Sequence, residues 1–360
     1  MTRRLWRVPI LATAAASLIW GVWLGLLRLG WALPLPWPDQ LILHGPLMIN
    51  GFLGTLIGLE RAVGIARRWA YAAPILTGVG SLWLVFGSPG PIGPLLITLG
   101  SATVVAVFVA VLHQHRAMFV VTMLTGAAAW VAGNVLWLAG FSLYRVVPWW
   151  MLFLVLTIAG ERLELNRLLR PRPIVRTVFG AAVLVLIAGA AIGYRWPEAG
   201  IRVVGAGLCA LAGWLVANDI ARRTLRQAGL TRFIAVCLLS GYLWLGAGGA
   251  IAIVFAAAES GPQHDAILHA IFLGFVVPMI FGHAPIIFPA ILRRPMRYRP
   301  RFYVHLILLH ASVALRLTGD LVEDLGRWRA WGGLLNMGAL LLFLLNTISS
   351  VVDSRTTSKG

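Results

Sequence analysis

The chain has 360 residues, of which 59% are hydrophobic and only 12% are charged, and its mean hydropathy is +0.86. A water-soluble surface needs more polar side chains than this composition supplies, so a soluble globular protein is excluded. The formal net charge is +18, yet the basic residues fall in short clusters between apolar runs of about 20 residues. This pattern indicates membrane topology and excludes a nucleic-acid-binding surface.

Apolar runs punctuated by proline, glycine and arginine predict about twelve transmembrane helices. In chain order we expect them near residues 9–30, 39–60, 70–87, 91–113, 117–142, 146–161, 174–194, 200–218, 232–257, 264–292, 302–318 and 329–351. A membrane β-barrel is excluded because barrel strands alternate apolar and polar residues, whereas these runs are continuously apolar. The expected fold is all-α, a polytopic helix bundle forming a single transmembrane domain over residues 1–360.

Arginine clusters mark one side of this bundle. They follow the second, sixth, eighth and tenth predicted helices, whereas the alternate connections at 34–39 and 88–94 contain no Lys or Arg. Cationic loops remain on the cytoplasmic side of a membrane. We therefore expect a multi-pass protein of the bacterial-type inner (plasma) membrane, with the lipid bilayer around it and both termini in the cytoplasm.

Histidines are the strongest candidates for chemistry because polar groups within a membrane are costly. The eight are His44, His113, His115, His264, His269, His283, His305 and His310. His44 and His269 each lie about five residues into helices of the same predicted direction, hence about 7–8 Å below the helix ends. Two imidazoles at one depth fit the axial ligands of a haem iron. The alternative is that each histidine only forms a hydrogen bond between helices.

Small residues surround both candidate ligands. They remove side-chain bulk where a porphyrin or another helix must come close, and they are Gly45, Gly51, Gly54, Gly58 and Gly274. The segment 44–52, His-Gly-Pro-Leu-Met-Ile-Asn-Gly-Phe, resembles helix II of the catalytic subunit of haem-copper oxidases. The segment 269–274, His-Ala-Ile-Phe-Leu-Gly, is similar to the low-spin haem ligand region of their helix X.

The resemblance implies a haem-copper oxidase subunit I-like bundle holding one b-type haem. His44 and His269 would then be the iron ligands, with Gly45, Met48 and Gly274 in the cofactor-binding segments. On size and the lack of extra domains the chain also resembles the NnrS family, twelve-span haem- and copper-containing membrane proteins linked to nitric oxide stress.

The sequence departs from the oxidase pattern at two places. Ile267 stands where the oxidases carry their high-spin haem ligand, and the predicted helices 146–161 and 174–194 contain no histidine for copper. A conventional oxygen-reducing binuclear centre is therefore not expected. A membrane oxidoreductase of another kind remains open, and the bis-histidine site is the part of the resemblance that is retained.

A second candidate metal site lies towards the predicted cytoplasmic side. It combines His283, His310 and Glu161, whose imidazole and carboxylate groups suit copper, non-haem iron or zinc, or a quinone head group. Pro285 and Pro289 are expected to break or kink the tenth helix over 282–289, which would free backbone carbonyls for a ligand. The alternative makes these histidines helix-end groups and Glu161 an interfacial anchor.

The sequence therefore favours a haem-binding inner-membrane protein in electron transfer, nitric oxide-related redox chemistry or stress response. A quinone or a redox protein would be its partner. The alternative is a cofactor-free transporter or channel that uses intramembrane histidine and glutamate side chains, with 282–289 as its binding site. A haem protein is coloured and such a transporter is not.

Overall fold

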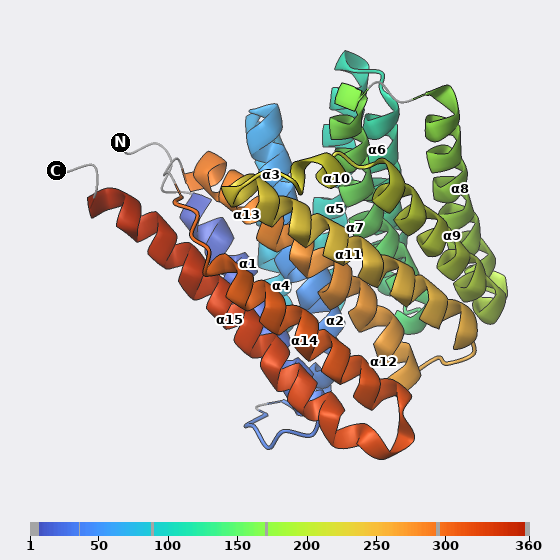
Figure 1. The fold of residues 1–360 in the computed structure, drawn as a ribbon. Coiled ribbons are helices and arrows are strands. Elements are labelled where there is room, and N and C mark those ends of the chain that lie inside the picture. The colour runs from blue at the N-terminus through green and yellow to red at the C-terminus, as the bar shows by residue number, and fades with distance from the viewer. Residues whose placement is uncertain (1–6, 36, 88–89, 170–171, 293–295, 357–360) are drawn as a thin grey trace. The chain divides into compact units, whose positions relative to one another are not determined.

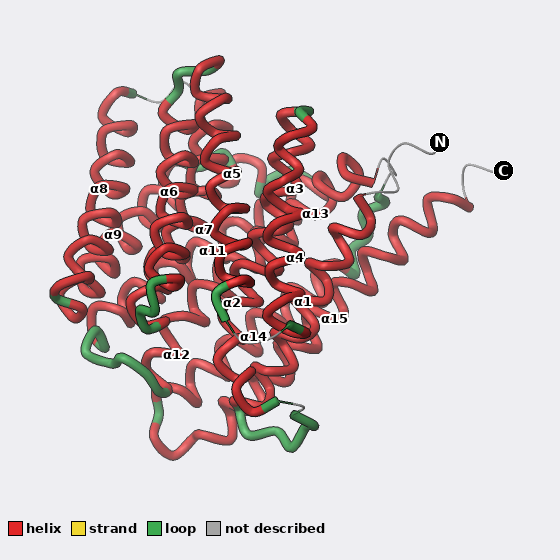
Figure 2. Tube along the Cα trace, turned by 180° about the vertical axis from the view of Figure 1, so that it is seen from behind, coloured by secondary structure: helices red, strands yellow, loops and turns green. Residues whose placement is uncertain are grey.

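The computed structural model describes residues 7–35, 37–87, 90–169, 172–292 and 296–356. Over these ranges the chain forms helices joined by loops and contains no strand (Figures 1 and 2). Twelve of the described helical segments are long and apolar enough to cross a membrane. The all-α class and the twelve predicted helices are therefore confirmed, and the chain is a multi-pass membrane protein.

Helix ends differ from the sequence prediction where the helices continue past charged residues. The second span covers Asp39–Ile65, the sixth Leu143–Asn166 and the twelfth Glu323–Ser350. An apolar run ends at the first charged side chain, but a helix needs only unbroken backbone hydrogen bonds. A helix can therefore continue through charged residues at the membrane surface, beyond the apolar segment that hydropathy detects.

The chain divides into two compact units, Met1–Gly160 and Glu161–Gly360. In the first unit the α-helices are α1 (Arg7–Arg28), α2 (His44–Pro46), α3 (Thr55–Ile65), α4 (Ala72–Phe86), α5 (Ile92–Gln114), α6 (Met118–Leu138) and α7 (Leu143–Asn166), the last of which ends beyond the unit boundary. Three other helical segments join them: the 3-10 helices η2 (Pro38–Leu43) and η4 (Arg68–Tyr71), and the π-helix η3 (Leu47–Gly54).

Buried indole rings organise the first unit. Trp130 of α6 lies over Gly54, where an added Cβ would come within 2.4 Å of the ring, and stacks on Phe153 with ring centroids 4.3 Å apart. The indole Nε1–H of Trp130 donates to Asn50 Oδ1 at 2.5 Å. Because lipid offers no hydrogen bonds, this pairing satisfies polar groups inside the bundle and fixes η3 against α6.

The second unit begins within the last turns of α7. Its further α-helices are α8 (Pro173–Arg195), α9 (Pro197–Asn218), α10 (Ala221–Thr224), α11 (Gly229–Val254), α12 (Pro262–His269), α13 (Val277–Leu292), α14 (Phe302–Leu321) and α15 (Gly326–Thr356). The 3-10 helices are η5 (Arg167–Leu169) and η7 (Glu323–Leu325), and η6 (Ala270–Val276) is a second π-helix.

Glycines let neighbouring helices of the second unit approach closely. An added Cβ on Gly319 would lie 2.3 Å from the backbone nitrogen of Arg329, and one on Gly332 would lie 2.6 Å from that of Arg316. Figure 1 shows α14 and α15 running side by side as a consequence. Close backbone approach through small residues is the usual means of helix packing in lipid.

The irregular part of the tenth span is not where the sequence predicted it. Residues 282–289 lie within α13, which is continuous despite Pro285 and Pro289. An added Cβ on Gly282 would lie 3.2 Å from Cys237 Cβ, so this glycine admits α11. The irregular segment is instead η6, directly after His269. Proline removes a backbone donor without ending a helix whose neighbours hold it in place.

The two π-helical segments share a local arrangement. Each follows a histidine, His44 before η3 and His269 before η6. Each also contains a glycine covered by an indole: Gly54 by Trp130, and Gly274 by Trp244, whose Cγ would lie 2.5 Å from an added Cβ. π-Helical turns occur frequently at functional sites, so both histidines are placed at the positions in their units where the helix geometry changes.

Candidate functional site

His44 is oriented by two residues of α1. Its Nδ1 lies 2.7 Å from the backbone oxygen of Gly21. One turn further along α1, an added Cβ on Gly25 would lie 2.9 Å from the imidazole Cε1. Gly21 therefore supplies a hydrogen-bond acceptor, and Gly25 supplies the space that the half-buried ring occupies.

His269 makes the same kind of hydrogen bond, but its acceptor is a carbonyl of its own helix. Its Nδ1 lies 2.7 Å from the backbone oxygen of Asp265, four residues earlier in α12. A carbonyl oxygen can only accept, so the proton of each neutral imidazole is on Nδ1 and the lone pair is on Nε2. Metal-binding histidines usually donate their other ring N–H to a carbonyl or carboxylate. His44 and His269 therefore both have the tautomer required of an Nε2 ligand.

Charged side chains hold the helix turn that orients His269. The Asp265 carboxylate pairs with Arg329 of α15 and lies 4.0 Å from an Arg316 guanidinium nitrogen of α14. Asp320, whose side chain is 0% exposed, lies 2.7 Å from Arg329 and 3.8 Å from Arg316. These two carboxylates and two guanidinium groups, which we call the α12/α14/α15 ion cluster, connect three helices next to His269.

The other predicted cofactor-binding residues have separate roles. A Cβ added on Gly45 would meet no described residue within 4 Å beyond its chain neighbours and its own helix backbone, so space is open next to His44 in the chain. Met48 packs on α1, where an added Cβ on Gly21 would lie 2.9 Å from its Sδ. Gly274 does not provide space for a porphyrin, because the Trp244 indole occupies that position.

The remaining predicted glycines serve contacts between helices. An added Cβ on Gly51 would lie 2.7 Å from Ser17 Oγ, and one on Gly58 would lie 3.3 Å from the backbone nitrogen of Pro74. Of the two explanations for these small residues, helix approach is the one that the contacts support.

His310 is engaged by protein groups at both ring nitrogens. Trp244 Nε1–H donates to its Nδ1 at 2.9 Å, so its own proton is on Nε2, which lies 2.9 Å from Ser240 Oγ. Ser240 in turn donates to the backbone oxygen of Val236 at 2.7 Å. With both nitrogens used in this way, His310 connects α11 to α14 and has no lone pair left for a metal ion.

The second predicted metal site is not assembled. His283 Nδ1 donates to the backbone oxygen of Met279 at 2.6 Å, the same arrangement as in His269, so this bond alone does not exclude ligation. Among the residues that the structure describes, no group of three or more His, Cys, Asp or Glu side chains could hold a metal ion, so His283, His310 and Glu161 do not form one. Their positions in the sequence predict a common depth on three helices. The direction of each side chain depends on its contacts with neighbouring residues, and depth along a helix does not determine those contacts.

Replacing His310 by leucine is expected to lower the free energy of unfolding by about 1–3 kcal/mol. The substitution leaves the Trp244 Nε1–H without its acceptor inside the bundle, where water does not replace it. Thermal unfolding of the detergent-purified protein measures the loss. His113→Leu is the control, because His113 is exposed and donates only to Val109 O within its own helix. Equal stability of both variants would contradict the structural role of His310.

Sequence reasoning did not identify the groups that orient the two candidate ligands. Gly21 and Gly25 are spaced by four residues in the first span, which is a recognisable small-residue pattern. Nothing in that pattern, however, indicates which residue of another helix will use the space. Asp265 is not among the site residues that the sequence predicts, yet its carbonyl and carboxylate both have partners in the structure.

Comparison with known proteins gives one match that covers almost the whole chain. A family model described as Domain of unknown function (DUF8744) matches residues 7–352. No curated protein matches the sequence.

Proposed function

The chain belongs to the DUF8744 family, and we propose that it is a haem-binding protein of the inner membrane in which His44 and His269 ligate the iron. The observation that carries the proposal is one tautomer in one local setting: both histidines come shortly before a π-helical segment, whereas His113 and His283, whose Nδ1 atoms also face a backbone carbonyl, do not. Both imidazoles donate Nδ1–H to a backbone carbonyl at 2.7 Å, and both therefore carry their lone pair on Nε2. Neutral imidazole with an oriented ring is the form that binds haem iron.

The surroundings of His44 fit this group, because a Cβ added on the neighbouring Gly45 would meet no described residue within 4 Å beyond its chain neighbours and its own helix backbone. Both imidazole rings are half-buried within their own units. Two axial imidazoles need no third protein ligand, so a haem site does not require the larger clusters of acidic, histidine or cysteine side chains that hold other metal ions.

A bound haem would supply reversible one-electron chemistry. In this role the Gly21 and Asp265 carbonyls hold the imidazoles in one tautomer and limit their rotation. A haem that His44 and His269 would both hold would suit electron transfer better than reactions of a bound substrate. A quinone or a redox protein would then exchange electrons with the chain. Nitric oxide-related chemistry, which the NnrS resemblance implies, is the second role that such a haem could serve.

The transporter alternative has less support at the place where it puts its substrate site. It placed a substrate site at a break over 282–289, and that stretch is part of the continuous helix α13. The buried carboxylates Asp219 and Asp320 and the half-buried Asp265 of the second unit are all paired with arginines, namely Arg162, Arg316 and Arg329. The haem proposal therefore has the more direct support from the geometry.

The first test is the visible spectrum of the detergent-purified protein, oxidised and after dithionite reduction, with a pyridine haemochrome assay. We expect about one b-type haem per chain and the sharp reduced bands of a six-coordinate, low-spin iron. A colourless preparation from haem-replete cells, which also fails to bind added haemin, would overturn the proposal.

A glycine of α1 provides a second test. Gly25→Ala is expected to weaken haem retention about ten-fold or more, because the added methyl group would lie 2.9 Å from the His44 ring and displace it. Haem content and the low-spin bands measure the effect. Gly64→Ala is the matched control, since nothing lies within 4 Å of a Cβ there. If both variants keep wild-type haem content, Gly25 does not position His44.

A further inference from the structure

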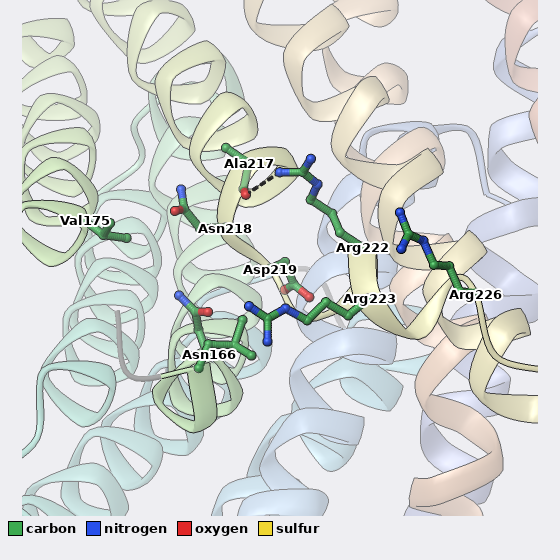
Figure 3. Close-up of a pocket in the computed structure, with 9 residues that line it drawn as sticks. Asn166, Val175, Ala217, Asn218, Asp219, Arg222, Arg223 and Arg226 are labelled. Atoms are coloured by element: carbon green, nitrogen blue, oxygen red, sulfur yellow. Dashed lines mark hydrogen bonds between the residues drawn. The ribbon is translucent and has the colours of Figure 1, made fainter. Parts of the chain in front are cut away.

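A pocket of about 480 Å³ lies within the second unit, and neither His44 nor His269 lines it (Figure 3). It is formed where α7 and α9 end and α8 begins, together with the α10 turn. Its lining includes Asn166, Asp219, Arg222, Arg223 and Arg226. Because these are the ends of membrane-spanning helices, the pocket is at the level where apolar chain gives way to polar chain.

The pocket is basic. Arg222, Arg223 and Arg226 all line it and come from the α10 turn and its continuation. In Figure 3 the Arg223 side chain extends toward Asn166 and that of Arg222 toward Ala217, and Arg226 lies to the right of both. Arg222 donates to the backbone oxygen of Ala217 at 2.8 Å, which holds its guanidinium against the end of α9. A guanidinium has further N–H donors in a planar array that matches the oxygens of a phosphate.

The acidic residue of the pocket is already neutralised. Asp219 Oδ2 lies 3.6 Å from Arg162 Nε and accepts from Tyr242 Oη at 2.9 Å. Asp219 Oδ1 accepts from the backbone N–H of Ala221 at 2.7 Å. The Arg162 and Asp219 side chains are only 3% and 1% exposed, so this pair is internal. The three arginines therefore determine the charge that the pocket presents to a ligand.

Asn166 adds a buried hydrogen-bond donor to the pocket, and the lack of a partner for this donor among the described residues indicates a ligand. The residue is 1% exposed and lines the pocket, and its Nδ2 has no hydrogen-bond partner among the described residues. A buried amide without a partner costs free energy comparable to a lost hydrogen bond. A ligand oxygen in the pocket would satisfy this group.

We propose that this pocket binds a phosphate group, with Arg222, Arg223 and Arg226 as its cationic contacts and Asn166 as a neutral donor. The place of the pocket at the helix ends favours the headgroup of an anionic phospholipid. Basic pockets between transmembrane helices are known sites for such headgroups. The inference is independent of the haem proposal, because it uses none of the same residues.

The test is native mass spectrometry of the full chain in a neutral detergent, with phosphatidylglycerol, phosphatidylcholine or inorganic phosphate added. We expect phosphatidylglycerol to bind above the phosphatidylcholine background. R223Q/R226Q should reduce this binding about ten-fold or more, while the Arg222 contact with Ala217 stays in place. N166L, which leaves the charge of the pocket unchanged, should reduce phosphatidylglycerol binding by a smaller factor.

The matched control is R67Q/R68Q/R116Q, which removes three exposed arginines of the first unit. It should leave binding unchanged. Binding of inorganic phosphate alone, lost in R223Q/R226Q, would support the site and identify a soluble phosphate as the source. Phosphatidylglycerol binding no stronger than that of phosphatidylcholine, with no phosphate binding, would overturn the proposal. An equal loss in the pocket and control variants would also overturn it.

Discussion

The double variant His44→Ala/His269→Ala is expected to purify without haem. Each alanine removes an Nε2 ligand, and the backbone carbonyls of Gly21 and Asp265 that orient the rings do not replace it. The Soret band and the pyridine haemochrome signal should fall to the level of a preparation without haem. Because both histidines are only half-buried, the helices themselves are expected to stay folded.

The single variants separate ligation from packing. His44→Ala alone should leave one imidazole on the iron, so we expect a high-spin, five-coordinate spectrum and a lower haem content. Added imidazole should restore the low-spin bands, because it fills the space that the side chain has left. A purely structural histidine would give no such rescue. His269→Ala should behave in the same way.

His113→Ala is the matched control for both. His113 also donates its Nδ1–H to a carbonyl four residues earlier, Val109 O at 2.8 Å, but it is exposed at the end of α5. Its loss should leave the spectrum unchanged. A double variant of His44 and His269 that keeps a full complement of haem with low-spin bands would show that other groups ligate the iron.

The helices could be predicted from the sequence because their signal is local. About 20 apolar residues are enough to span a bilayer, and lipid forces the backbone of such a run to bond to itself. The same reasoning gave the wrong place for the irregular part of the tenth span. Pro285 and Pro289 marked the expected break, but the contacts of Gly282 with α11 hold the helix there.

The candidate site could be predicted only in part for the same reason. Depth along a helix follows from residue counting, and it singled out His44 and His269. The direction of a side chain depends on its neighbours, which residue counting does not reveal. The sequence therefore predicts His310 as a metal ligand, although Trp244 and Ser240 use both of its ring nitrogens. The orienting role of Gly21 arises from a contact between α1 and α2, which no spacing rule reveals.

Asp320→Asn is expected to lower the free energy of unfolding by about 3–5 kcal/mol. Asp320 is 0% exposed and lies between two guanidinium groups, 2.7 Å from Arg329 and 3.8 Å from Arg316. In the α12/α14/α15 ion cluster the two carboxylates balance the two arginines. Removing one carboxylate leaves an uncompensated positive charge inside the bundle, where neither water nor lipid can solvate it well.

Two further variants determine whether charge balance is the cause. Asp320→Asn/Arg329→Met keeps one carboxylate and one guanidinium, Asp265 and Arg316, and should recover part of the lost stability. Glu198→Gln is the exposed control: it breaks the Glu198–Arg202 pair, whose side chains are about half exposed, and should change stability by only about 0–1 kcal/mol. If Asp320→Asn is no more destabilising than Glu198→Gln, the cluster does not hold α12, α14 and α15 together. Asp265 also orients His269. If the cluster does hold the three helices together, Asp320→Asn should therefore lower the haem content as well as the free energy of unfolding.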